Sequence, residues 1–303
     1  MAAVTDLALT PDLAGFRAAA AVEGCRAISV YTRLLADDFT PVGLYHQLCG
    51  DRTGTFLFES ADNGQWSRYS FVGVNAAATL TEDAGQAVWR WSGRAIEGLP
   101  TQGDPLDVLR ETLALLGTPR VEGLPTMTSG LVGYLGYDVV RRLEHLPDAP
   151  PDDLHLPELV MMLTTDLAVL DHHTGEVWLI ANALNFDASN AHVDDAYADA
   201  AARVHAMAER LCEPVSALVA VAASDVEPPA VSRQRTPAEY EALVADAVEE
   251  IRAGEAFQIV GSQRFEVPCD ADPLDVYRVL RRTNPSPYLY LLRLDGFAVV
   301  GSS

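Results

Sequence analysis

Several stretches of the chain place apolar residues at the spacing of an amphipathic helix. In residues 189–211 the apolar stripe consists of Val193, Tyr197, Ala200, Val204, Met207 and Leu211. In residues 237–253 it consists of Tyr240, Leu243, Val244, Ala247, Val248 and Ile251. The second helix starts at a capping box formed by Thr236 and Glu239, and Gly254 ends it. Shorter helices are predicted in residues 11–22, 40–48, 272–283, from 104 onward and after 138.

Other stretches have the alternating or continuous apolar pattern of β-strands. They are residues 27–33, 55–59, 69–74, 77–80, 87–92, 129–137, 158–170, 176–183, 257–265, 288–294 and 297–301. Turn signals at 62–64, 171–175 and 295–296 join neighbours as antiparallel hairpins. In residues 129–137 a glycine stands at every third position, which predicts close approach of another backbone.

A linker is predicted in residues 213–235, which contain Pro214, Pro228 and Pro229. We therefore expect one region from residue 1 to 235 and a second from 236 to 303.

Charge and cysteine usage exclude several classes of partner. The chain has 43 acidic and 21 basic residues, and its net charge of −22 argues against nucleic acid and anionic membrane surfaces. No apolar run is long enough to span a bilayer, and the first 22 residues do not resemble a signal peptide. The four cysteines are far apart without a C-x-x-C pair, and His172 and His173 have no third ligand nearby, so no metal site is predicted. We expect a cytoplasmic protein.

Two segments combine groups that suit a small zwitterionic aromatic ligand. In residues 284–288 (Asn-Pro-Ser-Pro-Tyr, the proline corner), Pro285 and Pro287 restrain the backbone and Tyr288 offers a flat ring. At the end of the strand 55–59, Glu59 could attract an ammonium and Ser60 could donate to a carboxylate. Alternatively, the proline corner is only a stiff connection, the Glu59 side chain is solvated, and Ser60 starts a turn.

Several motifs in one order resemble anthranilate synthase component I, a chorismate-utilising enzyme. They are Thr55-Phe56-Leu57-Phe58-Glu59-Ser60, Trp66-Ser67-Arg68-Tyr69-Ser70-Phe71, Phe257-Gln258-Ile259-Val260, Ser262-Gln263-Arg264-Phe265, the proline corner and Val300-Gly301-Ser302-Ser303. The resemblance covers the chain from about Leu34 onward.

The resemblance implies an α/β fold with large antiparallel sheets sandwiched between helices. It implies a lyase of tryptophan biosynthesis that converts chorismate and ammonia to anthranilate and pyruvate, in a heteromeric complex with a glutamine amidotransferase subunit (component II). Region 1–235 would be regulatory and partner-facing, and region 236–303 would begin the chorismate-binding catalytic part. The catalytic histidine, the chorismate contacts and the glutamates that hold Mg²⁺ are expected beyond residue 303.

The resemblance also implies an allosteric site for feedback inhibition by L-tryptophan. Carried over to this sequence, its residues are Ser60, Pro287, Tyr288 and Leu289, with Glu59, Asn284 and Pro285 beside them. Phe58 replaces the family's usual leucine, and Leu289 replaces a common methionine. Both changes keep the position apolar and put in doubt the tightness of inhibition more than the site.

Gln258 is the one position expected to line the active site. Relatives that add water to chorismate carry a lysine here as general base. An amide cannot take a proton from water near neutral pH, and the chain contains no lysine, so amination by ammonia fits better. Gln258 could also be a strand glutamine paired with a neighbour. The alternatives for the protein are aminodeoxychorismate synthase component I and a non-catalytic module that binds tryptophan and a partner subunit.

Overall fold

The computed structural model describes residues 7–61, 68–117, 121–215, 217–221, 227 and 229–303. The chain forms two compact units, Met1–Leu218 together with Pro273–Ser303, and Val219–Asp272. The predicted turn at 62–64, Trp66-Ser67 and residues 216, 222–226 and 228 of the predicted linker lie outside the described residues. The functional boundary near residue 235 stays a prediction.

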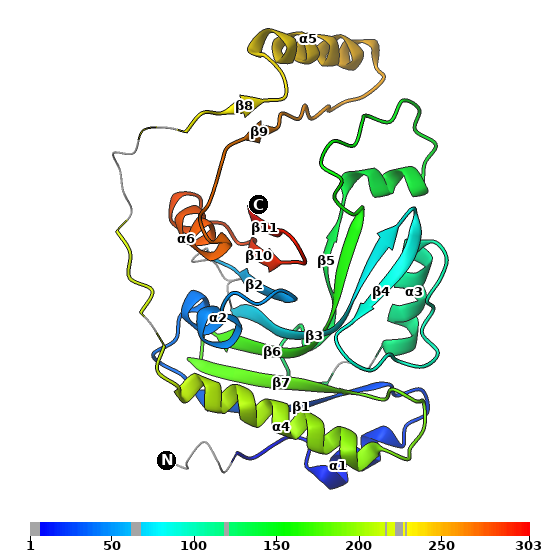
Figure 1. Ribbon diagram of the computed structural model, residues 1–303, viewed down its shortest axis with the longest axis vertical. Coiled ribbons are helices and arrows are strands. Elements are labelled where there is room, and N and C mark those ends of the chain that lie inside the picture. Colours follow the sequence, from blue (N-terminus) through cyan, green and yellow to red (C-terminus); the bar gives the residue numbers. More distant parts are fainter. Residues whose placement is uncertain (1–6, 62–67, 118–120, 216, 222–226, 228) are drawn as a thin grey trace. The chain divides into compact units, whose positions relative to one another are not determined.

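The larger unit contains an antiparallel sheet in the order β1-β7-β6-β3-β2-β10-β11, with β4 paired to β3 and β5 to β6 (Figure 1). Its strands are β1 (Ala27–Leu35), β2 (Thr55–Glu59), β3 (Tyr69–Asp83), β4 (Gln86–Trp91), β5 (Gly130–Leu135), β6 (Leu159–Asp171), β7 (Glu176–Leu184), β10 (Leu289–Arg293) and β11 (Ala298–Ser302). The sequence predicts each of these, except that the stretches 69–74 and 77–80 are one long strand. Register shifts around Asn75 bend β3 there, which explains the break in its pattern.

The helices of this unit are α1 (Leu13–Ala20), α2 (Pro41–Cys49), α3 (Pro105–Leu116), the 3₁₀ helix η1 (Tyr137–Arg142), α4 (Val193–Cys212) and α6 (Pro273–Thr283). Helices α2, α3 and α6 begin where the sequence predicts, whereas α4 begins later than expected, without a side-chain cap, and η1 begins one residue before the expected cap Asp138. The Asp12, Thr40 and Asp104 side chains accept from backbone N–H groups of the first turn of α1, α2 and α3. The short helix predicted after residue 138 is therefore of the 3₁₀ type.

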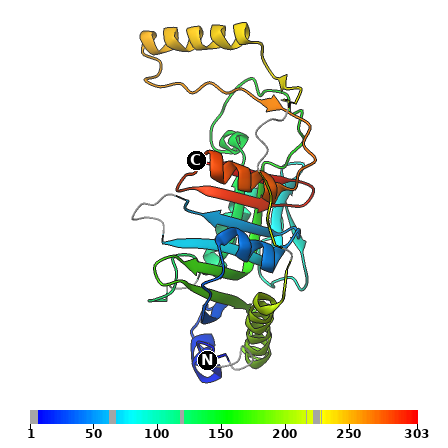
Figure 2. The same ribbon diagram turned by 90° about the vertical axis from the view of Figure 1, so that its left-hand side faces the viewer.

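The sheet is covered by helices on one face, as Figures 1 and 2 show for α2, α4 and α6. Side chains along β6 point alternately to the two faces of the sheet, and the core therefore forms two clusters. Ala168 and Leu170 pack in the cluster that includes these helices, whereas Leu167 and Val169 pack in the cluster on the other face. Tyr277 of α6 is fully buried in the first cluster. The position of α6 is therefore set by packing against the sheet.

Close backbone approach occurs in β5 at Gly133, as predicted, but not at Gly130, around which there is open space. A Cβ on Gly133 would lie 1.7 Å from the carbonyl oxygen of Val160 in β6. No side chain fits in that space, and the Gly133 position therefore requires glycine.

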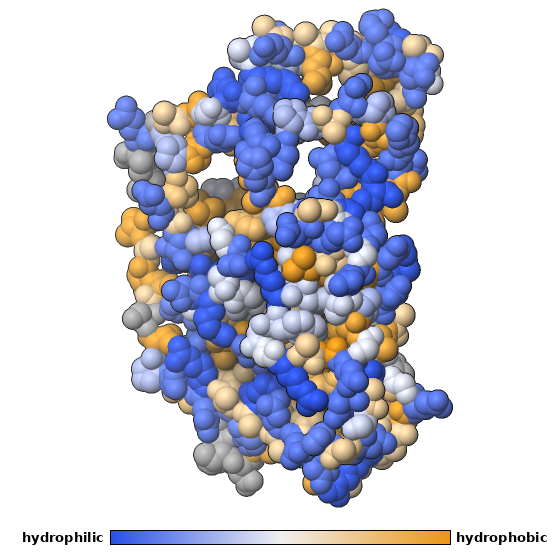
Figure 3. Space-filling view, turned by 45° about the vertical axis from the view of Figure 1, so that its right-hand side comes forward, coloured by the Kyte–Doolittle hydropathy of each residue, from blue (hydrophilic) through white to orange (hydrophobic). Residues whose placement is uncertain are grey.

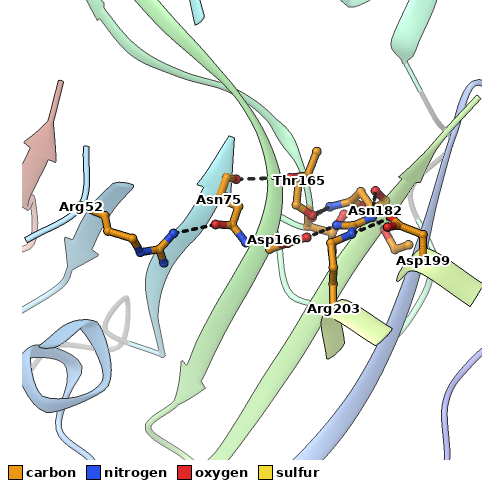
Figure 4. Close-up of polar contacts among 9 residues, drawn as sticks. Arg52, Asn75, Thr165, Asp166, Asn182, Asp199 and Arg203 are labelled. Carbon is orange, nitrogen blue, oxygen red and sulfur yellow. Dashed lines mark hydrogen bonds and ion pairs between the residues drawn. The ribbon is translucent and has the colours of Figure 1, made fainter. Parts of the chain in front are cut away.

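A buried polar network attaches α4 to the sheet (Figure 4). The Asp166 carboxylate is fully buried and accepts from Arg203 of α4 and from the Asn75 amide. Arg203 also donates to Asp199 and to the carbonyl oxygen of Asn182, each at 2.9 Å. Burial raises the pKa of Asp166, and the contacts with Arg203 and Asn75 oppose that rise.

The smaller unit contains α5 (Pro237–Ala253) and the paired β8 (Ser232–Arg233) and β9 (Phe265–Glu266). The predicted capping box of α5 is present, and Gly254 ends the helix in the left-handed conformation. The strand predicted over 257–265 is wrong, because only its last residue is paired in the described part of the chain. Phe257 and Val260 are exposed, and an isolated strand gains neither hydrogen bonds nor buried area.

Charged and polar side chains predominate over much of the surface in Figure 3, in keeping with the net charge of −22. Among the helices of the described residues, none combines the length and the apolar character needed to cross a membrane.

Candidate functional site

The predicted ligand segments meet at a pocket of about 390 Å³, here called the β2–β10 pocket. It is lined by Phe58, Glu59, Ser60, Tyr69, Phe71, Pro287, Tyr288, Leu289 and Tyr290. The two segments lie side by side because β2 and β10 are antiparallel neighbours in which Glu59 is the register partner of Leu289. The sheet therefore unites parts of the chain that are more than 200 residues apart in sequence.

A row of three rings lies across neighbouring strands of this pocket. Phe71 of β3 is the register partner of Phe58 of β2, and Phe58 is that of Tyr290 of β10. The next position along the row is Gly301 of β11, where a Cβ would lie 2.1 Å from the Tyr290 ring. Glycine there leaves room for the ring, and Phe58, Phe71 and Tyr290 (the aromatic row) offer a flat apolar surface on which an aromatic ligand can stack.

Ser60 supplies an unused polar group beside these rings. Its hydroxyl oxygen is buried and has no hydrogen-bond partner among the described residues. The neighbouring Ala61 amide donates to the carbonyl oxygen of Ser286 at 3.0 Å and thereby connects the end of β2 to the proline corner. A buried hydroxyl without a partner is costly unless a ligand or water engages it, and this favours Ser60 as a binding group.

The Glu59 carboxylate, in contrast, is fully engaged by α6. Its Oε2 accepts from the Tyr277 hydroxyl and from Arg281 Nε, and its Oε1 accepts from Arg281 Nη2, all at 2.7 Å. The side chain is only 2% exposed, so the alternative of a solvated carboxylate is wrong. We call Glu59, Tyr277 and Arg281 the Glu59 clamp.

The contacts within the Glu59 clamp shift the pKa values of Tyr277 and Arg281. Burial and then the negative charge of Glu59 raise the pKa of Tyr277 well above its ordinary value, so the phenol stays protonated and donates. The hydrogen bond to Glu59 raises the pKa of Arg281. Arg281 and Glu59 are joined by two parallel N–H···O bonds, the bidentate geometry typical of an arginine–carboxylate pair.

The proline corner is held by three bonds of its own. The Tyr288 amide donates to Ser286 Oγ at 3.2 Å, and the Ser302 hydroxyl donates to the carbonyl oxygen of Asn284 at 2.7 Å. The Ser303 amide donates to the carbonyl oxygen of Tyr288 at 3.2 Å. Pro287 and Tyr288 line the pocket, whereas the exposed Asn284 and Pro285 stand outside the lining residues.

The remaining candidate residues are not among those that line the β2–β10 pocket. Gln258 is exposed in the smaller unit, in a segment without strand pairing, and its role stays a prediction. His172 and His173 are exposed, and the His172 ring is hydrogen-bonded to the Ser70 hydroxyl at 2.8 Å. Partial burial of the ring, the largest effect, lowers the pKa of His172. The described residues hold no group of three or more histidines, cysteines or acids placed to bind a metal.

Tyr277 and Arg281 were not identified from the sequence. They follow Leu274 at intervals of three and four residues, so all three share one face of α6. An arginine on the stripe that buries Leu274 and Tyr277 indicates an acidic partner inside, and this signal was available in the sequence.

The sequence model of a family described as chorismate binding enzyme matches residues 53–303. The chain belongs to the chorismate binding enzyme family. The β2–β10 pocket lies entirely within the matched residues. The family resemblance carried by the motifs is thus confirmed.

Within the chorismate binding enzymes, the chain is similar to proteins named anthranilate synthase component 1. It is 50% identical to that of Mycolicibacterium smegmatis over 98% of this chain and 57% of the relative. It is 48% identical to that of Mycobacterium tuberculosis, over 98% of this chain and 58% of the relative. The chain therefore spans less than two thirds of the length of these relatives.

A solved structure confirms the fold class of a mixed α/β protein with a large antiparallel sheet. The crystal structure of anthranilate synthase component I from Streptococcus pneumoniae matches with a TM-score of 0.62 at 25% identity. The match covers 89% of this chain and 57% of that chain.

Proposed function

We propose that the protein acts as anthranilate synthase component I, a lyase that aminates chorismate with ammonia and releases pyruvate to form anthranilate. The observation that carries this proposal is the 50% identity to a protein of that name over 98% of this chain. The amide at Gln258 supports amination over hydration, because ammonia is already a nucleophile and needs no base to activate it.

The proposal includes a glutamine amidotransferase subunit as the source of ammonia and a cytoplasmic location. It also includes Mg²⁺, but the described residues do not fit a metal site, since they contain no cluster of three candidate ligands. In this proposal region 1–235 is regulatory and faces the partner, and region 236–303 begins the catalytic part.

We further propose that the β2–β10 pocket binds L-tryptophan as a feedback inhibitor. Three features support an indole amino acid: the aromatic row for the indole ring, the Ser60 hydroxyl, which has no partner among the described residues, for the carboxylate, and the restrained Pro287–Tyr288 backbone. Leu289, Glu59, Asn284 and Pro285 belong to the same proposed site, although the Leu289 side chain packs in the cluster on the face opposite the aromatic row. Because β10 and β11 continue directly from the proline corner, a bound ligand can bias the arrangement of that part of the sheet.

The proposed reaction is tested by product analysis. The full-length protein is supplied with chorismate, ammonium and Mg²⁺, and the products are separated and identified by their absorbance and fluorescence. We expect anthranilate and an equal amount of pyruvate. Formation of 4-amino-4-deoxychorismate without pyruvate would assign the protein to the aminodeoxychorismate synthases. Residues 1–303 assayed alone should bind L-tryptophan without turnover.

A further inference from the structure

The Glu59 carboxylate leaves β2 on the face opposite the aromatic row. Side chains alternate along a strand, so Glu59 shares a face with Leu57. Leu57 packs in the core cluster that contains Leu274 and Tyr277 of α6, whereas Phe58 packs with the cluster on the other face. The charged end of Glu59 is thus directed into α6 and away from the rings.

The carboxylate also has little capacity left for a ligand. Both oxygens accept charge-assisted bonds from Arg281, and Oε2 additionally accepts from Tyr277. A bidentate guanidinium neutralises the carboxylate charge and fixes its orientation. Three of the about four acceptor positions of the carboxylate are occupied, and the Glu59 side chain is only 2% exposed, so little of it is left for a ligand ammonium.

The clamp is continuous with the pocket through the chain itself. Helix α6 ends at Thr283 and runs directly into the proline corner, and the Asn284 amide still donates to the carbonyl oxygen of Leu280. On the other side, the Ala61 amide holds the carbonyl oxygen of Ser286. The clamp therefore joins the two segments whose spacing defines the mouth of the pocket.

We propose that Glu59 is a positioning residue of the tryptophan site: with Arg281 and Tyr277 it holds α6 against β2 and so sets the pocket geometry, without touching the ligand. This inference rests on the proposed L-tryptophan site. Ligand affinity then depends on Arg281 and Tyr277, neither of which lines the pocket.

The test compares four variants of the intact protein by calorimetric titration: Glu59→Gln, Arg281→Gln, Arg281→Lys and Tyr277→Phe. Arg282→Gln is the matched control, since Arg282 is the exposed neighbour of Arg281 on the same helix. The ligands are L-tryptophan and indole-3-propionate, which lacks the ammonium. We expect Glu59→Gln and Arg281→Gln to weaken both ligands by a similar factor, on the order of tenfold. Tyr277→Phe should have a smaller effect, and Arg281→Lys should recover part of the loss.

A direct ammonium contact at Glu59 predicts a different pattern. Arg281→Gln would then free the carboxylate and bind L-tryptophan as tightly as the parent or more tightly. Glu59→Gln would weaken L-tryptophan alone and leave indole-3-propionate unchanged. Either result overturns the proposal.

Hydrogen exchange of the Ala61 amide tests the clamp without any ligand. In Arg281→Gln and Tyr277→Phe this amide should exchange faster, while amides of β6 and the Arg282→Gln control stay as in the parent. Unchanged Ala61 exchange in both variants overturns the proposal. A parent that binds no L-tryptophan refutes the proposed effector site, and the Ala61 amide still decides whether the clamp positions the proline corner.

Discussion

Asp166 and Glu59 are both buried carboxylates on the helix-covered face of the sheet, and each is paired with an arginine from a helix. They differ in surroundings. Asp166 lies inside the sheet beside the bend of β3, and it does not line the β2–β10 pocket. Glu59 lies at the last residue of β2, where it contributes to the pocket wall.

The partners differ as well. The Arg203 side chain is 25% exposed and the Arg281 side chain is 42% exposed. If the proposed tryptophan site is correct, a similar ion pair serves stability alone in one place and the geometry of a ligand pocket in the other. The position of the carboxylate relative to a cavity decides which role it has, and the residue types do not.

The largest expected effect on stability comes from Arg203→Ala. The substitution leaves the Asp166 carboxylate buried with Asn75 as its remaining partner, and we expect the free energy of unfolding to fall by about 3–5 kcal/mol. Urea denaturation followed by circular dichroism measures the change. Arg17→Ala, which removes an exposed ion pair with Asp194, is the control and should leave the midpoint in place. A loss no larger than that of the control would show that Asp166 does not need its arginine.

Arg281→Gln should reduce the free energy of unfolding less, by about 1–3 kcal/mol. Tyr277 continues to donate to Glu59, and water can reach the site more easily through the more exposed arginine. The same urea titration measures the difference. If Arg281→Gln cost as much as Arg203→Ala, exposure of the partner would not explain the contrast between the two pairs.

The pH dependence distinguishes Asp166 from Asp171, a second buried acid of β6. Burial opposes ionisation of Asp171, but bonds from Arg68 and from the His173 amide outweigh it and lower its pKa below 3.8. Its stabilising contribution is therefore complete above that value and is lost as the pH falls through the lowered folded-state pKa. The contribution of Asp166 to stability changes with pH in the opposite direction, because the pKa of Asp166 is raised in the folded state. This contribution is largest below pH 3.8 and is lost as the pH rises through the folded-state pKa.

Stability measured between about pH 5 and pH 2 checks these signs. The advantage of the parent over Asp171→Asn should shrink as the pH falls, whereas its advantage over Asp166→Asn should grow. If the two stability differences changed with pH in the same direction, the pKa shifts of Asp166 and Asp171 would not have opposite signs.

Ser60→Ala should have the smallest effect on stability, within about 0.5 kcal/mol, because the hydroxyl has no protein partner to lose among the described residues. Binding of L-tryptophan should nevertheless weaken by about 1–3 kcal/mol if the hydroxyl donates to its carboxylate. Calorimetric titration beside thermal unfolding separates the two effects. A variant that binds L-tryptophan like the parent would remove Ser60 from the site.

Local patterns were sufficient for most of the fold. The capping box at Thr236 and the proline at Pro273 placed helix starts correctly, because they satisfy backbone N–H groups whatever lies around them. The strand over 257–265 failed for the converse reason, since a strand depends on neighbours that no local pattern specifies. The two apolar stripes were equally clear, yet α4 is packed and α5 has no buried residue.

In the candidate site, too, the residue types could be read from the sequence, whereas the contacts between distant segments could not. The sequence by itself determined which segments carry groups that suit a zwitterionic aromatic ligand, because Glu59, Ser60 and the proline corner are recognisable from residue type and order. Only the tertiary structure decided that Phe58, Phe71 and Tyr290 form one row and that Glu59 faces Arg281 of α6. Strand register and the packing of α6 bring together residues that are far apart in sequence, and such long-range contacts depend on the whole sheet at once.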